Sequence, residues 1–159
     1  MLDTGAHTIS QEHPLASAAE VQASIAQAFD TYITELAQAG AVWEKKPAGA
    51  AGGEAAWCAR EVAEHIASSG PFFGAGIAAA IGVAGPVPAR ISLESVDTAV
   101  AETRRTHGLL MEVVAQVRDD QVDQEIDHPR LGENTVGGFL GMVTYHLNDH
   151  AQQLKTLRG

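Results

Sequence analysis

The stretch VGGFLGMVTYHLNDHAQQLKTL, residues 136–157, decides the fold class. Its apolar residues recur at intervals of three and four, which is typical of a helix face turned toward a core. This stripe comprises Val136, Phe139, Leu140, Val143, Leu147, Leu154 and Leu157, and His146 and His150 interrupt it at the same spacing. Asn134 or Thr135 can cap the start of the helix. The stretch therefore predicts a long C-terminal helix with two histidines on its buried side.

The pair His146 and His150 needs a chemical explanation, because an imidazole is costly to bury without a partner. Side chains four residues apart on a helix lie one above the other and can direct ring nitrogens at one point, as metal-binding helices require. Core histidines bonded to carbonyls or hydroxyls would give the same pattern. Two ligands do not make a metal site, so the metal hypothesis needs a third.

The best candidate for a third ligand is His65, in the segment WCAREVAEHI, residues 57–66. It lies beside Val62 and Ile66 on the apolar side of the helix that this segment predicts. Glu61 lies one turn earlier on the same face, where it could orient an imidazole or accept a proton. It could equally be a helix-boundary residue paired with a neighbouring arginine. Three imidazoles would form a site that leaves one position for water or substrate.

These segments together resemble the DinB-like superfamily. The resemblance rests on Trp57, the helix with Glu61 and His65, the segment HPRLGENT (128–135) and the segment YHLNDHAQQ (145–153), and it extends from about residue 18 to residue 157. It implies a four-helix bundle in which His65, His146 and His150 hold one divalent metal ion. Imidazole ligands suit zinc, nickel, copper and iron, and we expect zinc or nickel. Cys58 stands where the family often has a small hydroxyl residue, which weakens a helix cap but leaves the ligands intact.

The resemblance is less specific for the reaction, because the superfamily includes thiol S-transferases, mycothiol-dependent maleylpyruvate isomerases and hydrolases. It favours a metal-dependent enzyme that activates a low-molecular-weight thiol for transfer to an electrophile. A hydrolase that uses metal-bound water, or a non-catalytic metal-binding bundle linked to stress, remains an alternative. Arg104 and Arg105 could bind the carboxylates of a thiol, and His107 could contact the substrate. A solvated helix face and a satisfied core histidine are the simpler interpretations of these three residues.

Hydrophobic periodicity predicts four main helices, at about residues 17–39, 57–69, 93–118 and 135–157. Ser17 and Glu20 form a capping box at the start of the first. The second should end near Ser69, because Gly70 and Pro71 follow. Residues 72–81 then predict a short extra helical segment before a Gly/Pro loop. No convincing strand pattern is present, so we expect an all-α four-helix bundle.

This bundle should form one domain over residues 1–159, with residues 1–16 as a loose arm that carries His7 and His13. His128, which precedes a proline, should lie in a connecting loop. At 159 residues and 45% hydrophobic content the chain can bury a substantial core. Apolar side chains between helices two and three, namely Phe72, Phe73, Ile77 and Ile81, suggest a homodimer surface.

Charge and composition exclude several classes of partner. The formal net charge of −10 disfavours nucleic acids and anionic membranes as partners. The resemblance to the DinB-like superfamily implies a small-molecule substrate. Residues 70–89 carry no charge, but five glycines and three prolines interrupt them, and a membrane span needs about 20 apolar helical residues. A single cysteine and the lack of a signal-peptide pattern predict a cytoplasmic protein.

Overall fold

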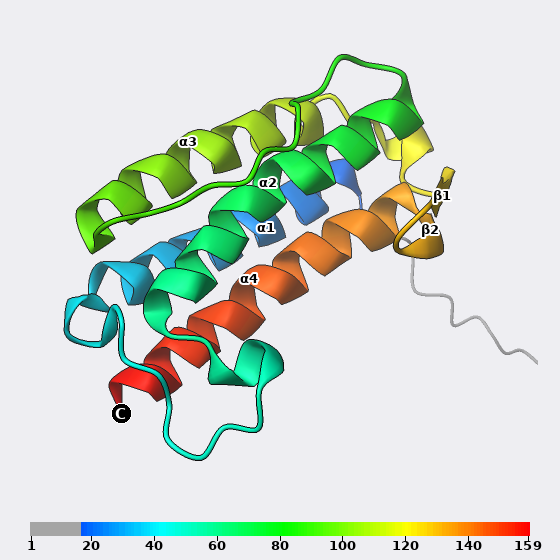
Figure 1. Ribbon diagram of the computed structural model, residues 1–159. Coiled ribbons are helices and arrows are strands. Elements are labelled where there is room, and N and C mark those ends of the chain that lie inside the picture. Colours follow the sequence, from blue (N-terminus) through cyan, green and yellow to red (C-terminus); the bar gives the residue numbers. More distant parts are fainter. Residues whose placement is uncertain (1–16) are drawn as a thin grey trace, which may run out of the picture.

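Four long helices pack side by side in the computed structural model, which describes residues 17–159 (Figure 1). They are α1 (Ala18–Ala37), α2 (Ala59–Ile81), α3 (Val96–Val114) and α4 (Val136–Arg158). Short 3-10 helices lie between them at η2 (Gly40–Val42), η3 (Gly53–Ala56) and η4 (Asp119–Gln121). The prediction of an all-α four-helix bundle is confirmed. The predicted N-terminal arm, with His7 and His13, lies outside the described residues.

The helices pair in a way that brings the two predicted histidine segments together. α1 packs most extensively on α4 and α2 on α3, and the α2–α4 contact closes the bundle on the side of the histidines. Apolar faces of all four helices meet in one core, which includes Tyr32, Leu36, Val62, Ile66, Leu110, Phe139 and Leu140. Burial of these faces supplies the main force that holds the helices in place.

Helix starts follow the capping residues in the sequence. Ser17 and Glu20 form the predicted capping box of α1. The hydroxyl of Thr135 accepts the Gly138 N–H at 3.0 Å and so caps α4. Such caps satisfy main-chain N–H groups that lack a partner in the first turn of a helix. They explain why α1 and α4 begin where the sequence predicted.

The second helix corrects one prediction: it does not end near Ser69 but continues through Pro71 to Ile81. The separate segment predicted at residues 72–81 is therefore the second half of α2. Proline removes one helical hydrogen bond, but its fixed φ is compatible with a helix, and here tertiary packing prevails over local propensity. Both Gly70 and Pro71 are buried against the neighbouring helix. The helix ends at Gly82, whose φ of 76° is the left-handed value typical of a glycine C-cap.

A small β-hairpin before α4 corrects a second prediction. Strand β1 (Glu125–His128) pairs antiparallel with β2 (Gly132–Thr135), and Gly132 has a φ of 77° beside the turn. Each strand has only four residues, and Ile126 is the buried one in β1. A strand of four residues is too short to show a clear alternation of apolar and polar residues in the sequence. His128 thus lies at the end of a strand rather than in a loop, and its ring packs near Phe72 and Phe139, at centroid distances of 5.3 and 5.7 Å.

None of the helices in residues 17–159 combines the length and apolar character that a membrane span requires.

Candidate metal centre

The three predicted ligands meet where α2 lies against α4. His65 comes from α2, and His146 and His150 come from successive turns of α4. Each offers a ring nitrogen, and these atoms all lie within 4.8 Å of one another. Nε2 of His65 lies 2.7 Å from Nε2 of His146. Zinc–nitrogen bonds are about 2.0–2.1 Å long, so ligand nitrogens must converge to within a few ångströms, as these do. The cluster could therefore hold one metal ion.

Packing around the cluster fixes the two helices that carry it. Val62 and Ile66, on either side of His65, are buried in the core, and so are Val143 and Leu147 next to His146. These contacts orient the histidine faces of α2 and α4 toward each other. The apolar stripe identified in the sequence thus determines where the imidazoles point.

The cluster favours neutral imidazole, which is the form that binds metal. Desolvation by burial lowers the pKa of His65, with a further contribution from the nearby His150. Burial lowers the pKa of His146 to about 3, again with contributions from His150 and His65. Protonating any member places a positive charge beside two other imidazoles. At neutral pH, His65 and His146 therefore have free lone pairs.

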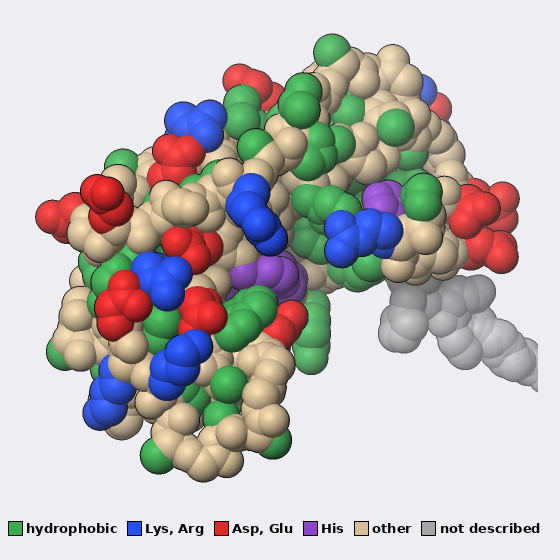
Figure 2. All heavy atoms as spheres, in the orientation of Figure 1, with side chains coloured by type: hydrophobic (Ala, Val, Ile, Leu, Met, Phe, Trp, Pro, Cys, Tyr) green, Lys and Arg blue, Asp and Glu red, His purple; other side chains and the backbone are tan. Residues whose placement is uncertain are grey.

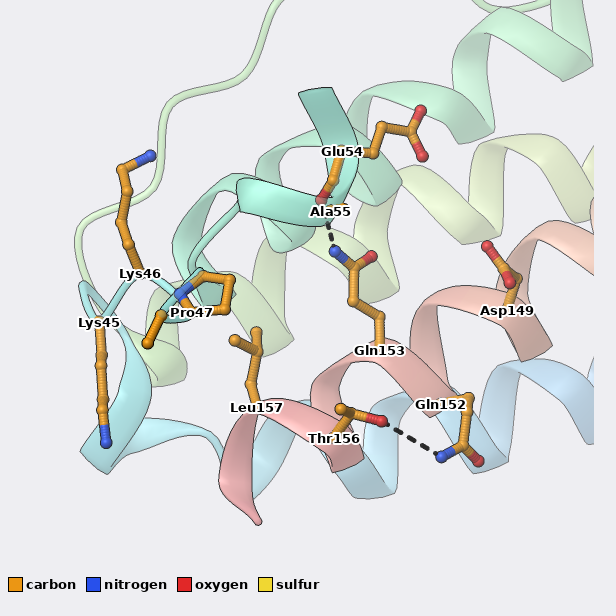
Figure 3. A pocket seen from close by; sticks show the side chains of 11 residues that line it. Lys45, Lys46, Pro47, Glu54, Ala55, Asp149, Gln152, Gln153, Thr156 and Leu157 are labelled. Atoms are coloured by element: carbon orange, nitrogen blue, oxygen red, sulfur yellow. Dashed lines mark hydrogen bonds between the residues drawn. The ribbon is translucent and has the colours of Figure 1, made fainter. Parts of the chain in front are cut away.

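His150 is almost fully buried and is oriented by a neighbour on the same helix. Its Nδ1 lies 2.7 Å from Oε1 of Gln153, an atom that can only accept a hydrogen, so Nδ1 donates. The amide nitrogen of Gln153 in turn donates to the main-chain carbonyl of Glu54 at 2.7 Å (Figure 3). This chain of contacts leaves Nε2 of His150 as the free ring nitrogen. Ligand histidines in metalloproteins commonly have such a partner on the second nitrogen.

Glu54 and Trp57 complete the surroundings of the cluster from the segment before α2. Oε1 of Glu54 lies 3.7 Å from Nε2 of His150. The indole of Trp57 lies 5.0 Å from the ring of His65 and 6.2 Å from that of His150, between centroids. The indole therefore covers the imidazoles on one side, while a carboxylate approaches them from η3. Sequence reasoning missed Glu54, because residues 47–56 show no periodicity that would indicate where its side chain points.

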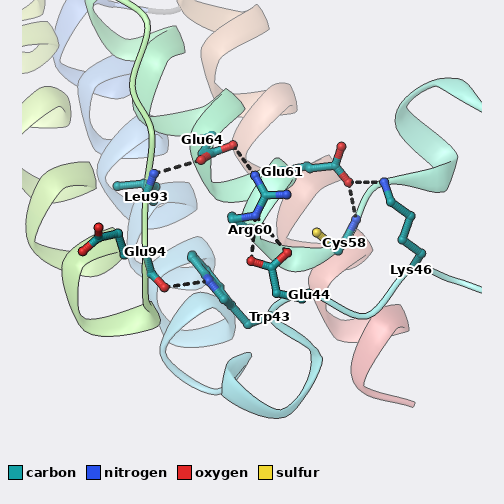
Figure 4. A network of polar contacts seen from close by, with 9 residues as sticks. All are labelled: Trp43, Glu44, Lys46, Cys58, Arg60, Glu61, Glu64, Leu93 and Glu94. Carbon is teal, nitrogen blue, oxygen red and sulfur yellow. Dashed lines mark hydrogen bonds and ion pairs between the residues drawn. The ribbon is translucent and has the colours of Figure 1, made fainter.

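The structure places Glu61 at the start of α2, where it is engaged by other groups (Figure 4). Its carboxylate accepts the Cys58 N–H at 3.1 Å and pairs with Nζ of Lys46 at 2.6 Å. The hydrogen bond from Lys46, followed by that from Cys58, lowers the pKa of Glu61 to about 2. Within residues 17–159 no hydrogen bond joins Glu61 to a histidine. The helix-boundary interpretation fits these contacts, with a lysine rather than an arginine as the partner.

The other predicted contact residues lie on α3, away from the cluster. Arg104 is exposed, and Nε of Arg105 pairs with Glu102 at 2.9 Å. The ring of His107 stacks on Phe29 with centroids 3.6 Å apart, and burial lowers its pKa to about 4. His107 shares with His146 a cavity of about 10 Å³, roughly the volume of a single water probe. The structure does not bring these α3 residues to the three ring nitrogens.

An open cleft of about 630 Å³ adjoins the cluster, and we call it the histidine cleft. Figure 2 shows histidine side chains in a hollow on this face, with Lys and Arg side chains beside it. Clefts of this size commonly bind small molecules. The lining residues are Glu54, His65, Ser68, Ser69, Phe72, Phe73, Pro88, Ala89, Arg90, Arg130, Leu131, Met142 and His146.

A second cavity, of about 690 Å³, is lined by Glu54 and Gln153 among other residues (Figure 3). Lys45, Lys46 and Asp149 line it, and none of the three clustered histidines does. Glu54 borders both spaces. His65 and His146 are therefore reached from the histidine cleft, because they form part of its wall.

Comparisons with known proteins identify the family and support the fold. A family model described as the DinB superfamily matches residues 23–154. The crystal structure of TT2238, described as a four-helix bundle protein, resembles the chain with a TM-score of 0.65 and 24% sequence identity. The match covers 88% of this chain and 99% of that one. This likeness supports the fold. The search of curated proteins found no match.

Proposed function

The chain belongs to the DinB superfamily, and from this premise we propose that it is a metal-dependent enzyme that activates a small thiol for transfer to an electrophile. One observation carries the proposal: imidazoles that could hold a metal ion form part of the wall of an open cleft. His65, His146 and His150 would hold one divalent ion, and imidazole ligands suit zinc and nickel. When bound, the ion would act as a Lewis acid that lowers the pKa of a thiol in the cleft.

The chain's own residues have two tasks in this reaction. Glu54 lies beside the imidazoles and accepts the proton when the S–H bond of the thiol breaks. Phe72 and Phe73 provide an apolar wall that limits water around the sulfur. The sulfur then uses its free electron pair to form a bond to the electrophilic carbon. The leaving group departs with the electron pair of its former bond to carbon.

Hydrolysis is a second candidate, and the position of Glu54 favours it. A carboxylate 3.7 Å from Nε2 of His150 could accept a proton from water as readily as from a thiol. A purely structural ion is less consistent with the geometry. Structural zinc has a closed ligand shell, whereas His65 and His146 line an open cleft.

The test starts with metal analysis of untagged protein, followed by loading with zinc or nickel. Loaded protein is then assayed with mycothiol, bacillithiol and glutathione against an activated aryl halide. We expect conjugation above the metal-free rate with at least one thiol, and loss of that excess in His146→Ala. Gln152→Ala, at an exposed position outside the histidine cleft, is the control and should retain the rate. If every thiol reacts at the metal-free rate while metal is retained, the transferase proposal fails, and hydrolysis or metal binding alone becomes the better account.

The homodimer stays a prediction, but two residues that suggested it have another role. Phe73 and Ile77 are buried within their own bundle, because α2 continues past Pro71 and carries them into the core. Phe72 and Ile81 are partly buried. Light scattering at micromolar concentration measures the mass, and a monomer would contradict the prediction.

A further inference from the structure

The histidine cleft contains two arginines, Arg90 and Arg130, that form no ion pair with a carboxylate within residues 17–159. Four of the chain's seven arginines do form such pairs, namely Arg60, Arg105, Arg118 and Arg158. The chain has twice as many acidic as basic residues, 20 against 10. In so acidic a chain, it is unusual that one cleft contains two exposed guanidinium groups without a carboxylate partner.

The side chain of Arg130 lies over an aromatic wall. Its Cζ lies 5.3 Å from the centroid of the Phe72 ring, within the range of a cation–π contact. Its main-chain N–H donates to Nδ1 of His128 at 3.1 Å, and the His128 ring packs near Phe72. These contacts position the guanidinium beside the cleft and leave its N–H groups available for a bidentate partner.

Arg90 lines the cleft from a different part of the chain, the segment between α2 and α3. That segment is tied to the bundle just after Arg90: the Leu93 N–H donates to Glu64 at 2.8 Å, and the indole of Trp43 donates to the Glu94 carbonyl at 3.1 Å (Figure 4). The main chain next to Arg90 is thus held in place although its side chain is exposed. Arg90 and Arg130 therefore both line the histidine cleft from segments that are held in place by contacts with the rest of the bundle.

The remaining wall is mainly apolar, with Phe72, Phe73 and Met142 partly or fully buried between the arginines and the histidines. Glu54 is the acidic residue in the lining, on the η3 segment beside His150. A complementary ligand therefore has an apolar or aromatic body and an anionic group that reaches the guanidinium groups.

We propose that the histidine cleft binds a small organic anion, whose carboxylate or sulfonate pairs with Arg90 and Arg130 and whose apolar body packs on Phe72 and Phe73. The identification of this anion as the electrophile of the thiol transfer rests on the proposed function. The binding of the anion in the cleft does not depend on that function. Arg104 and Arg105, which the sequence suggested as contacts for the carboxylates of a thiol, do not line this cleft.

The binding test uses metal-free full-length protein and two fluorescent probes with the same rings. 1-Anilinonaphthalene-8-sulfonate carries an anionic group, and N-phenyl-1-naphthylamine is the same molecule without it. Replacing both arginines, in Arg90→Gln/Arg130→Gln, should raise the Kd of the sulfonate about tenfold or more at low salt, because two charge-assisted contacts are lost. The Kd of the uncharged probe should change less than about twofold.

Two further variants locate the site. Arg104→Gln removes an exposed arginine that also lacks an ion pair in the described chain but lies outside the cleft, so it should leave both affinities unchanged. Phe72→Ala should weaken both probes. The proposal is overturned if the double variant binds the sulfonate like the parent, if both probes weaken equally in it, or if Arg104→Gln has the same effect.

The assay contains neither metal nor thiol, so its outcome is independent of the proposed reaction. If the double variant loses sulfonate binding and the metal-loaded parent protein shows no transferase activity, the anion site is supported and the thiol chemistry is rejected. If the double variant binds the sulfonate as the parent does and the metal-loaded parent conjugates a thiol, the anion site alone is rejected. For the substrate assignment, the double variant should raise KM for an anionic electrophile and leave KM for an uncharged one unchanged. Equal changes in both KM values would contradict that assignment.

Discussion

Oε1 of Gln153 accepts the Nδ1 hydrogen of His150 at 2.7 Å, so the imidazole is held in the form with a free Nε2. The amide of Gln153 also donates to the carbonyl of Glu54, which ties η3 to α4 beside the cluster. One side chain thus sets both the orientation of a candidate ligand ring and the position of the segment that carries the Glu54 carboxylate. This relationship gives the first prediction.

Gln153→Leu should weaken metal binding about 10- to 100-fold, because the ring of His150 loses the acceptor that orients it. Competition with a chromophoric chelator measures the affinity. Gln152→Leu is the matched control, since the neighbouring amide is exposed and lies 3.4 Å from the Thr156 hydroxyl instead. Equal affinities in the two variants would contradict the role assigned to Gln153.

Alanine at His65, His146 or His150 should each lower metal occupancy sharply, because every substitution removes one of three ligands. Elemental analysis of purified protein measures the metal content. His128→Ala should retain metal, because His128 packs on Phe72 and Phe139 outside the cluster, and we expect the same of alanine at His7 and His13. Stoichiometric metal in the triple variant of the cluster would show that the ligands were wrongly chosen.

Acid should destabilise the metal-free protein partly through His107, whose pKa is lowered to about 4 by burial against Phe29. The unfolded chain protonates this imidazole near pH 6.5, so between pH 6.5 and pH 4 the unfolded state binds a proton that the native state does not. Stability should fall as the pH falls through this window, by on the order of 2 kcal/mol for this residue.

Urea unfolding of the parent and of His107→Phe at pH 7 and pH 4.5 isolates that contribution. Phenylalanine keeps an aromatic ring against Phe29 and cannot titrate, so the variant should lose less stability than the parent on acidification. His65 and His146 titrate in both proteins, and their contribution cancels in the difference. If the stability of the parent and of His107→Phe depends on pH in the same way, His107 is ruled out as a source of the acid destabilisation.

Gly70→Ala should destabilise the fold by about 1–3 kcal/mol, because an added Cβ would lie 2.9 Å from the main-chain carbonyl oxygen of Thr106 on α3. Gly108→Ala is the matched control in α3, since no atom lies within 4 Å of its added Cβ. It should stabilise by about 0.5–1 kcal/mol, because alanine loses less entropy in a helix. Thermal unfolding followed by circular dichroism measures both. Similar shifts in the two variants would mean that α2 and α3 do not approach closely at Gly70.

Sequence reasoning succeeded where a long periodic pattern carries the information. The stripe of α4 spans six turns, so it predicted the helix and also the side of it on which His146 and His150 lie. It failed at Pro71, where a local stop signal is overridden by packing of α2 on α3. The hairpin at residues 125–135 was missed because its strands are too short to show alternation.

The cleft was less predictable than the ligands, because much of its chemistry comes from irregular segments. Glu54 lies in η3, Arg90 in the segment before α3, and Arg130 in the turn between β1 and β2. No periodicity links such positions, and only the tertiary fold brings them together. Arg104 and Arg105 were suggested by the ability of guanidinium groups to bind carboxylates, which says nothing about which cleft these residues border.

The histidines of the cleft lie on helices, whereas its two arginines lie on segments that connect helices or strands. Helices α2 and α4 cannot change much without loss of the core, whereas the segments that carry Arg90 and Arg130 contribute fewer buried residues to it, among them Leu93 and Ile126. Under the proposed function, exchange of those two connections would give the same bundle a different choice of substrate while its three imidazoles stay in register. The fold thus keeps the candidate metal centre on two core helices and the charged rim of the cleft on the segments that connect the elements.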